Sequence, residues 1–84
     1  MDTKASAFAE EAIRAVGRGD VPGARIAVVQ AYDIDHALGA LVDAVYLACA
    51  EIEEDGGVST ATWNGLADAV PSGSLLAVVE ASRT

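Results

Sequence analysis

The residues of this chain that could do chemistry are few, and several of them lie in one short segment. Asp33, Asp35 and His36 place two carboxylates and the only histidine within four positions, and such groups can bind a divalent metal ion or transfer a proton. A calcium-binding loop would need a closing glutamate where Ala44 stands. Aspartates at a helix start commonly cap its free N–H groups. We therefore interpret both aspartates as caps, predict a solvent-exposed His36 and expect no metal site.

The sequence contains few residues that could act in nucleophilic catalysis. The single cysteine, Cys49, lies in the apolar run of residues 48–50, where burial favours the neutral thiol over the reactive thiolate. There is no second histidine to act as a separate base, and the glycines do not follow the spacing of phosphate-binding or dinucleotide-binding loops. A lone cysteine excludes a disulfide within the chain. We predict that the protein is not an enzyme and has neither catalytic residues nor a cofactor.

Four acidic residues gather near the end of one predicted helix, namely Glu51, Glu53, Glu54 and Asp55. The C-terminal end of a helix carries partial negative charge, so acidic side chains there oppose the helix dipole. Departures from such local rules often occur where a function requires them. Two interpretations stay open: the cluster is a solvated helix end, or it is a docking site for a basic protein.

Charge is distributed unevenly along the chain. Its 84 residues include 5 Lys+Arg and 13 Asp+Glu, a net charge of −8, and no Lys or Arg lies between Arg25 and Arg83. Nucleic-acid binding needs cations that displace the counterions of the phosphates, so we exclude nucleic acid as a partner. The acidity either favours a basic partner or only keeps an alanine-rich surface soluble.

Length and composition predict a single domain spanning residues 1–84. Apolar residues make up 52% of the chain, and 18 positions are alanine, which argues against disorder. The longest mostly apolar stretch, residues 37–50, contains Asp43 and is shorter than the roughly 20 residues that span a bilayer. The N-terminus lacks the basic start and apolar run of a secretory signal. We expect a cytoplasmic protein without a membrane partner. The abundance of alanine, glycine and valine, together with four Arg to one Lys, suggests a bacterial source.

Hydrophobic periodicity predicts helices along the whole chain. Apolar residues recur every three or four positions in residues 3–16, after a cap at Asp20, in residues 34–54 and after a cap at Ser59. The third segment follows a heptad pattern of Ile34, Leu38, Leu41, Val45, Ala48 and Ile52. Residues 72–82 fit either a short helix or a strand. We predict an all-α bundle of four to five short helices, with a long central helix at about 34–54 as its most buried element.

The first two predicted helices resemble a single tetratricopeptide hairpin. The resemblance covers residues 5–38 and rests on the spacing of Phe8, Ala12, Gly19, Asp20, Ala24, Val28, Ala31 and Asp35. Arrays of that family bind peptides of partner proteins, and they need about three repeats for stability. One repeat length further on, Tyr46 and Val58 stand where small residues belong. We interpret the resemblance as shared hairpin packing rather than membership of the family.

The sequence contains more large apolar residues than so small a core can bury. An 84-residue domain buries only about 60–65% of the surface that its unfolded chain exposes. Leu47 falls on the polar side of the third predicted helix and Tyr46 lies at its edge. A two-fold dimer would bury the surplus and add stability. We predict a homodimer whose interface includes Tyr46, Leu47, Trp63, Leu75, Leu76 and Val79.

Together these patterns predict a small acidic helical module for protein–protein interaction, with a second copy of itself and a basic protein as partners. One alternative is a helical pocket that binds a small apolar ligand or cofactor, or a small subunit of an enzyme. Another is an acidic neutraliser that imitates nucleic acid towards a basic partner. The dependence of binding affinity on salt distinguishes these functions. Electrostatic docking weakens as ionic strength rises, whereas binding of an apolar ligand does not.

Overall fold

The computed structural model describes residues 2–83, and within that range it contains five α-helices, one short 3-10 helix and no strand. Their bounds are α1 (Thr3–Gly17), α2 (Val21–Ile34), the 3-10 helix η1 (His36–Leu38), α3 (Gly39–Asp55), α4 (Thr60–Ala69) and α5 (Gly73–Ser82). The predicted all-α bundle is confirmed, and residues 72–82 contain a helix rather than a strand. No helix in residues 2–83 has the length and hydropathy that crossing a membrane would require.

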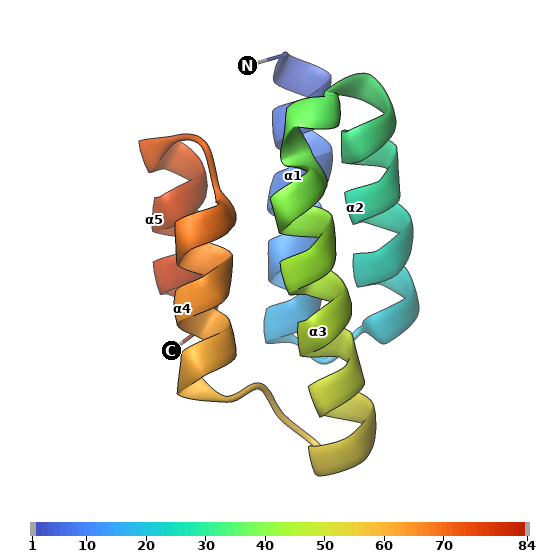
Figure 1. The fold of residues 1–84 in the computed structure, drawn as a ribbon, viewed down its shortest axis with the longest axis vertical. Coiled ribbons are helices and arrows are strands. Elements are labelled where there is room, and N and C mark those ends of the chain that lie inside the picture. Colours follow the sequence, from blue (N-terminus) through green and yellow to red (C-terminus); the bar gives the residue numbers. More distant parts are fainter. Residues whose placement is uncertain (1, 84) are drawn as a thin grey trace.

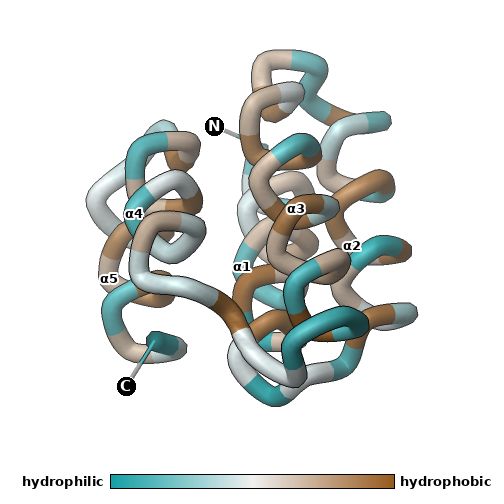
Figure 2. The backbone as a smooth tube through the Cα atoms, turned by 60° about the horizontal axis from the view of Figure 1, so that its bottom comes forward, coloured by the Kyte–Doolittle hydropathy of each residue, from teal (hydrophilic) through white to brown (hydrophobic). Residues whose placement is uncertain are grey.

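Helices α1 and α3 form the middle of the bundle. On one side, α2 packs against both of them; on the other, α5 packs against α1, and α4 packs against α3 (Figure 1). Figure 2 shows the same division from another direction, with α4 and α5 standing as a pair beside the other three helices. The middle pair is therefore covered by two helices on one side and by a single helix on the other.

The most buried helix is α1, and the prediction that the third helix has this role is wrong. Six of the 15 residues of α1 are buried, against four of the 17 in α3. The buried residues of α1 are Ala5, Ala9, Ala12, Ile13, Ala15 and Val16. Most of them are alanines, whose small side chains let α2, α3 and α5 all approach α1, whereas one side of α3 faces solvent.

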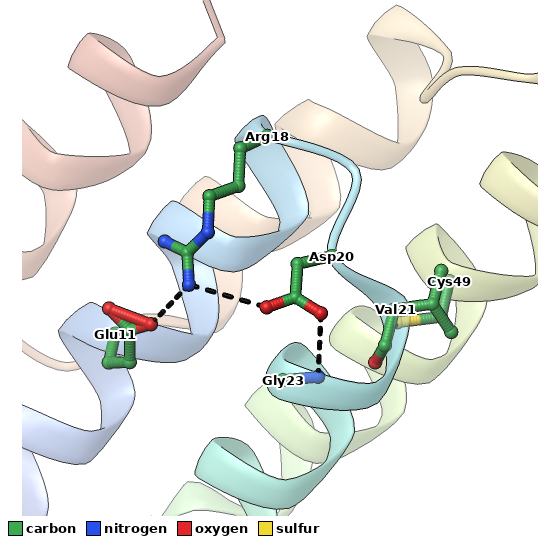
Figure 3. Close-up of polar contacts among 6 residues, drawn as sticks. All are labelled: Glu11, Arg18, Asp20, Val21, Gly23 and Cys49. Atoms are coloured by element: carbon green, nitrogen blue, oxygen red, sulfur yellow. Dashed lines mark hydrogen bonds and ion pairs between the residues drawn. The ribbon is translucent and has the colours of Figure 1, made fainter.

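The turn between α1 and α2 is built by Gly19 and Asp20. Gly19 has a positive φ of 77°, a conformation that glycine adopts without a steric penalty. Asp20 caps α2 as predicted, because its Oδ1 accepts the backbone N–H of Gly23 at 3.1 Å. The Arg18 guanidinium lies 2.6 Å from the Glu11 carboxylate and 3.4 Å from that of Asp20 (Figure 3). These contacts fix the direction in which α2 leaves the turn.

The third helix begins at Gly39 rather than near Ile34, where the heptad pattern had placed its start. Ile34 is the last residue of α2 and is exposed. Asp35 then adopts an extended backbone, and its Oδ1 accepts the N–H of Ala37 at 3.0 Å. Asp35 therefore ends α2 and caps η1 instead of α3. The first residue of the predicted heptad pattern that is buried is therefore Leu38 and not Ile34.

Helices α4 and α5 form the C-terminal hairpin that covers one side of the bundle. Ser59 and Ser72 are their N-caps, and each side-chain oxygen accepts a backbone N–H three residues further on, at 3.2 and 3.3 Å. A Cβ at Gly17 would lie only 3.0 Å from the carbonyl oxygen of Ser82. The absence of a side chain at Gly17 therefore permits the close approach of α1 and α5.

Candidate functional site

The residues considered first for chemistry do not converge on one site. Cys49 is fully buried, as predicted; its Sγ lies 3.9 Å from the carbonyl oxygen of Val21, and burial raises the pKa of the thiol. His36 is exposed, as predicted, and its ring centroid lies 5.0 Å from that of Tyr32. Asp33 is an exposed residue near the end of α2 and caps no helix start, so its predicted capping role is wrong. Within residues 2–83, no three His, Cys, Asp or Glu side chains are placed to hold a metal ion.

Two members of the acidic cluster are held by contacts within the chain. Glu51 joins the end of α3 to the start of α4: its Oε1 accepts the backbone N–H of Ser59 at 2.8 Å, and its Oε2 accepts the hydroxyl of Thr62. These hydrogen bonds, led by that from Thr62, hold the pKa of Glu51 below its ordinary value. Glu53 pairs with Arg25 of α2 at 2.9 Å. Both carboxylates therefore have structural partners.

The other two members, Glu54 and Asp55, are exposed and form no ion pair within the described residues. The predicted docking cluster is thus reduced to these two positions. The role of Glu51 was missed because its partners lie beyond the loop that follows α3. The sequence contained one signal for this role. A serine N-cap such as Ser59 is often followed three residues later by Glu or Gln, whose side chain accepts the backbone N–H of the cap residue. That position holds Thr62, and the carboxylate comes from Glu51 instead.

Three of the six predicted interface residues are buried in the core of this chain. They are Trp63, Leu75 and Val79, which are 9%, 1% and 0% exposed. The α4–α5 hairpin folds back on α1 and α3 and so buries them without help from a partner. They offer almost no accessible surface for the docking of a second copy.

The other three predicted interface residues are exposed, but they do not form one patch. Tyr46 and Leu47 lie on α3 and are 42% and 55% exposed, whereas Leu76 lies on α5 and is 40% exposed. Helix α5 packs against α1 and α4, on the side of the bundle away from α2 (Figure 1). A single self-matching patch containing all three residues is therefore not present.

Most of the exposed apolar surface lies over α2 and α3, and sequence reasoning found only its α3 part. Among the described residues, six of the seven large apolar side chains that are exposed belong to these two helices. Ile26 and Val29 line a shallow groove of about 300 Å³ together with Arg25, Gln30 and Tyr46. We call these five residues the α2–α3 surface. The clue in the sequence is the apolar run of residues 26–29, because a helix cannot turn four consecutive side chains inward.

Arg25 crosses the α2–α3 surface and is already partnered. Its guanidinium pairs with Glu53 at 2.9 Å, and its Cζ lies 5.7 Å from the centroid of the Tyr46 ring. An exposed ion pair of this kind contributes only about 0–1 kcal/mol. Its main consequence is geometric, because it holds the arginine and the tyrosine side by side along the groove.

A second groove, of about 390 Å³, lies where α1, α3 and α5 end. Its lining includes the apolar side chains of Val16, Ile52 and Trp63 and the guanidinium-bearing Arg18 and Arg83. Two of the five basic residues of the chain thus border one groove. Both are engaged in contacts with neighbouring side chains.

No family model, curated protein or solved structure matches this chain.

Proposed function

We propose that this protein is a small acidic interaction module that binds another protein through the α2–α3 surface and does no chemistry of its own. The observation that carries this proposal is the grouping of exposed apolar side chains on one side of the bundle. Ile26 is 62% exposed and Tyr46 is 42% exposed, and both side chains line the groove between α2 and α3. Scattered apolar residues are ordinary on a protein surface, whereas a contiguous apolar patch is typical of an interaction site.

The arrangement of the reactive side chains supports a binding role over a catalytic one. Cys49 is buried with a raised pKa, and His36 is exposed beside Tyr32. Nucleophilic catalysis by a thiol is typically supported by a base within hydrogen-bonding reach of it. The hydrogen bond of Cys49 is to a backbone carbonyl and not to a base.

Two kinds of partner follow from the sequence, a second copy of the chain and a basic protein, and both belong to this proposal. A dimer through the originally predicted patch loses the three residues that are buried. Within this proposal, a dimer would use the α2–α3 surface instead, on the two helices that carry most of the exposed large apolar side chains. A basic protein would be attracted by the net charge of −8.

Site-specific photo-cross-linking tests the proposed surface. A benzophenone amino acid placed at Ile26 should form covalent adducts with another polypeptide in the cells that make this protein. The same group placed at Leu76, which is exposed on α5, is the matched control and should form few adducts. Equal labelling from the two positions, or no adduct at either, would contradict an interaction through the α2–α3 surface.

The groove beside Trp63 favours a second candidate function, the binding of a small apolar ligand that carries an acidic group. Its apolar lining and its two arginines suit a fatty acid, for which decanoate is a simple probe. Trp63 is the only tryptophan and lines this groove, so its fluorescence is a probe of ligand binding there. Decanoate should change the emission, and Arg83→Gln should weaken the effect. Unchanged emission across the titration would remove this candidate.

A further inference from the structure

The α2–α3 surface has the shape that a helix of a partner would fill. Its groove runs between two helices, and its apolar side chains come from both walls: Ile26 and Val29 from α2, and Tyr46 from α3. A partner helix that presents apolar residues every three or four positions can place them along such a groove. The surface is therefore better suited to one face of an amphipathic helix than to a small ligand, because it is shallow and open.

The charges around this surface have one sign. Asp33 follows Val29 by four residues on α2, and Asp43 precedes Tyr46 by three on α3, so helical periodicity places each acid on the same face as its apolar neighbour. Both carboxylates are exposed and form no ion pair within residues 2–83.

The only basic group of the surface does not balance these acids. Arg25 is already paired with Glu53 at 2.9 Å, so their charges offset one another. The apolar groove therefore lies within a rim whose uncompensated charges are all negative.

This charge distribution separates the two partners that the proposed function allows. In a two-fold dimer the same patch meets itself, so acids would face acids, and like charges across an interface are costly. A helix that carries Lys or Arg beside its apolar face would instead pair with Asp33 and Asp43. Resting on the proposed function, we propose that the α2–α3 surface binds a basic amphipathic helix of another protein.

Two synthetic helical peptides of equal length test this proposal on the full chain. Both carry leucines at one-face spacing; one has lysines at the flanking positions and the other has glutamates. Fluorescence anisotropy of the labelled peptides gives their affinities. The lysine peptide should bind at least about tenfold more tightly than the glutamate peptide, and its affinity should fall as NaCl rises from about 0.05 M to about 0.5 M.

Matched variants locate the binding on the surface. Ile26→Ser should weaken the lysine peptide by about tenfold, whereas Leu76→Ser, on exposed α5, should leave its affinity unchanged. Asp43→Asn should lower the affinity and flatten its dependence on salt, whereas Asp68→Asn, at an exposed acid of α4, should do neither. Circular dichroism of each variant checks that the helices are intact.

Several results would overturn the proposal. Equal effects of Ile26→Ser and Leu76→Ser, or of Asp43→Asn and Asp68→Asn, would show that the peptide is attracted by net charge alone. Absence of binding, or equal binding of the glutamate peptide, would overturn it as well. A dimer in sedimentation equilibrium that Ile26→Ser converts to monomer would identify a second copy as the occupant, and the proposed interaction function would then survive. Absence of cross-links at position 26 would instead refute the interaction function itself.

Discussion

The two sides of the α1–α3 pair are covered in different ways. The α4–α5 hairpin supplies two helices to one side, and there Leu66, Leu75 and Val79 are buried. A single helix, α2, covers the other side, and Ile26 and Val29 remain exposed on it. Helices α2 and α5 both carry apolar residues around much of their circumference, so composition does not explain why one hides its large side chains better than the other.

The positions of the large residues within each helix explain the difference. Both helices pack against two others, α5 against α1 and α4 and α2 against α1 and α3. The buried positions of α5 hold Leu75 and Val79, whereas three of the five buried positions of α2 hold alanine. Large residues of α2 therefore fall on its outer side. Helix α2 packs against α1 and α3, but nothing in the described structure covers its outer side (Figure 1). Exposed apolar residues that have no packing role within the chain indicate a site of interaction with another molecule.

The largest expected effect compares one residue from each side. Leu75→Ala should lower the free energy of unfolding by about 2–5 kcal/mol, because it leaves a cavity beneath the hairpin. Ile26→Ala, at a side chain that is 62% exposed, should change it by less than about 0.5 kcal/mol. Urea denaturation followed by circular dichroism measures both. Equal destabilisation by the two variants would mean that the outer side of α2 is packed within the folded chain.

A smaller effect concerns the turn that positions α2. A Cβ at Gly23 would overlap the Asp20 carboxylate that caps this helix. Gly23→Ala should therefore disturb the cap and lower the free energy of unfolding by about 1 kcal/mol, although alanine is the better helix former. Thermal unfolding measures the change.

Gly65→Ala is the matched control for this substitution. Gly65 lies within α4, and a Cβ there would meet no atom within 4 Å. Alanine should raise the free energy of unfolding by about 0.5–1 kcal/mol. A gain in stability from both substitutions would show that the cap at Asp20 is dispensable for α2.

The smallest effect concerns the hydrogen bonds that attach the α4–α5 hairpin to the end of α3. Glu51→Gln should lower the melting temperature, because Glu51 uses both carboxylate oxygens as acceptors and glutamine has only one acceptor oxygen. Glu54→Gln should leave the melting temperature unchanged or slightly raised, because an unpaired acid at the end of α3 opposes the helix dipole.

The contribution of Glu51 should also depend on pH. Its pKa in the folded chain lies below the ordinary value of 4.5, so the stabilisation is complete above about pH 4.5 and is lost as pH falls through the folded-state value. The difference in melting temperature between the unmodified chain and Glu51→Gln should shrink over that range. A difference that is constant with pH would contradict the hydrogen-bonded carboxylate.

Local patterns in the sequence were enough to predict the helices and most of their limits. The caps at Asp20 and Ser59 and the burial of Cys49 followed from residue types and spacing, because capping and amphipathic periodicity act over three or four residues. The start of the third helix was misplaced because Ile34 fits the apolar pattern on either side of the break at Asp35. The fold class was thus determined by the sequence read locally.

The tertiary structure alone decided which apolar and acidic residues remain on the surface. Trp63 and Leu75 are surplus apolar residues by sequence, but they are buried because the hairpin to which they belong packs against α1 and α3. Glu51 is a free acid by sequence, but in the folded chain it accepts a hydrogen bond from Thr62. Conversely, Ile26 belongs to a helix whose outer side has no neighbour. Burial depends on which helices meet, and those contacts join segments that lie far apart in the chain. Periodicity within one segment determines a helix and its faces, but not the partner that covers each face.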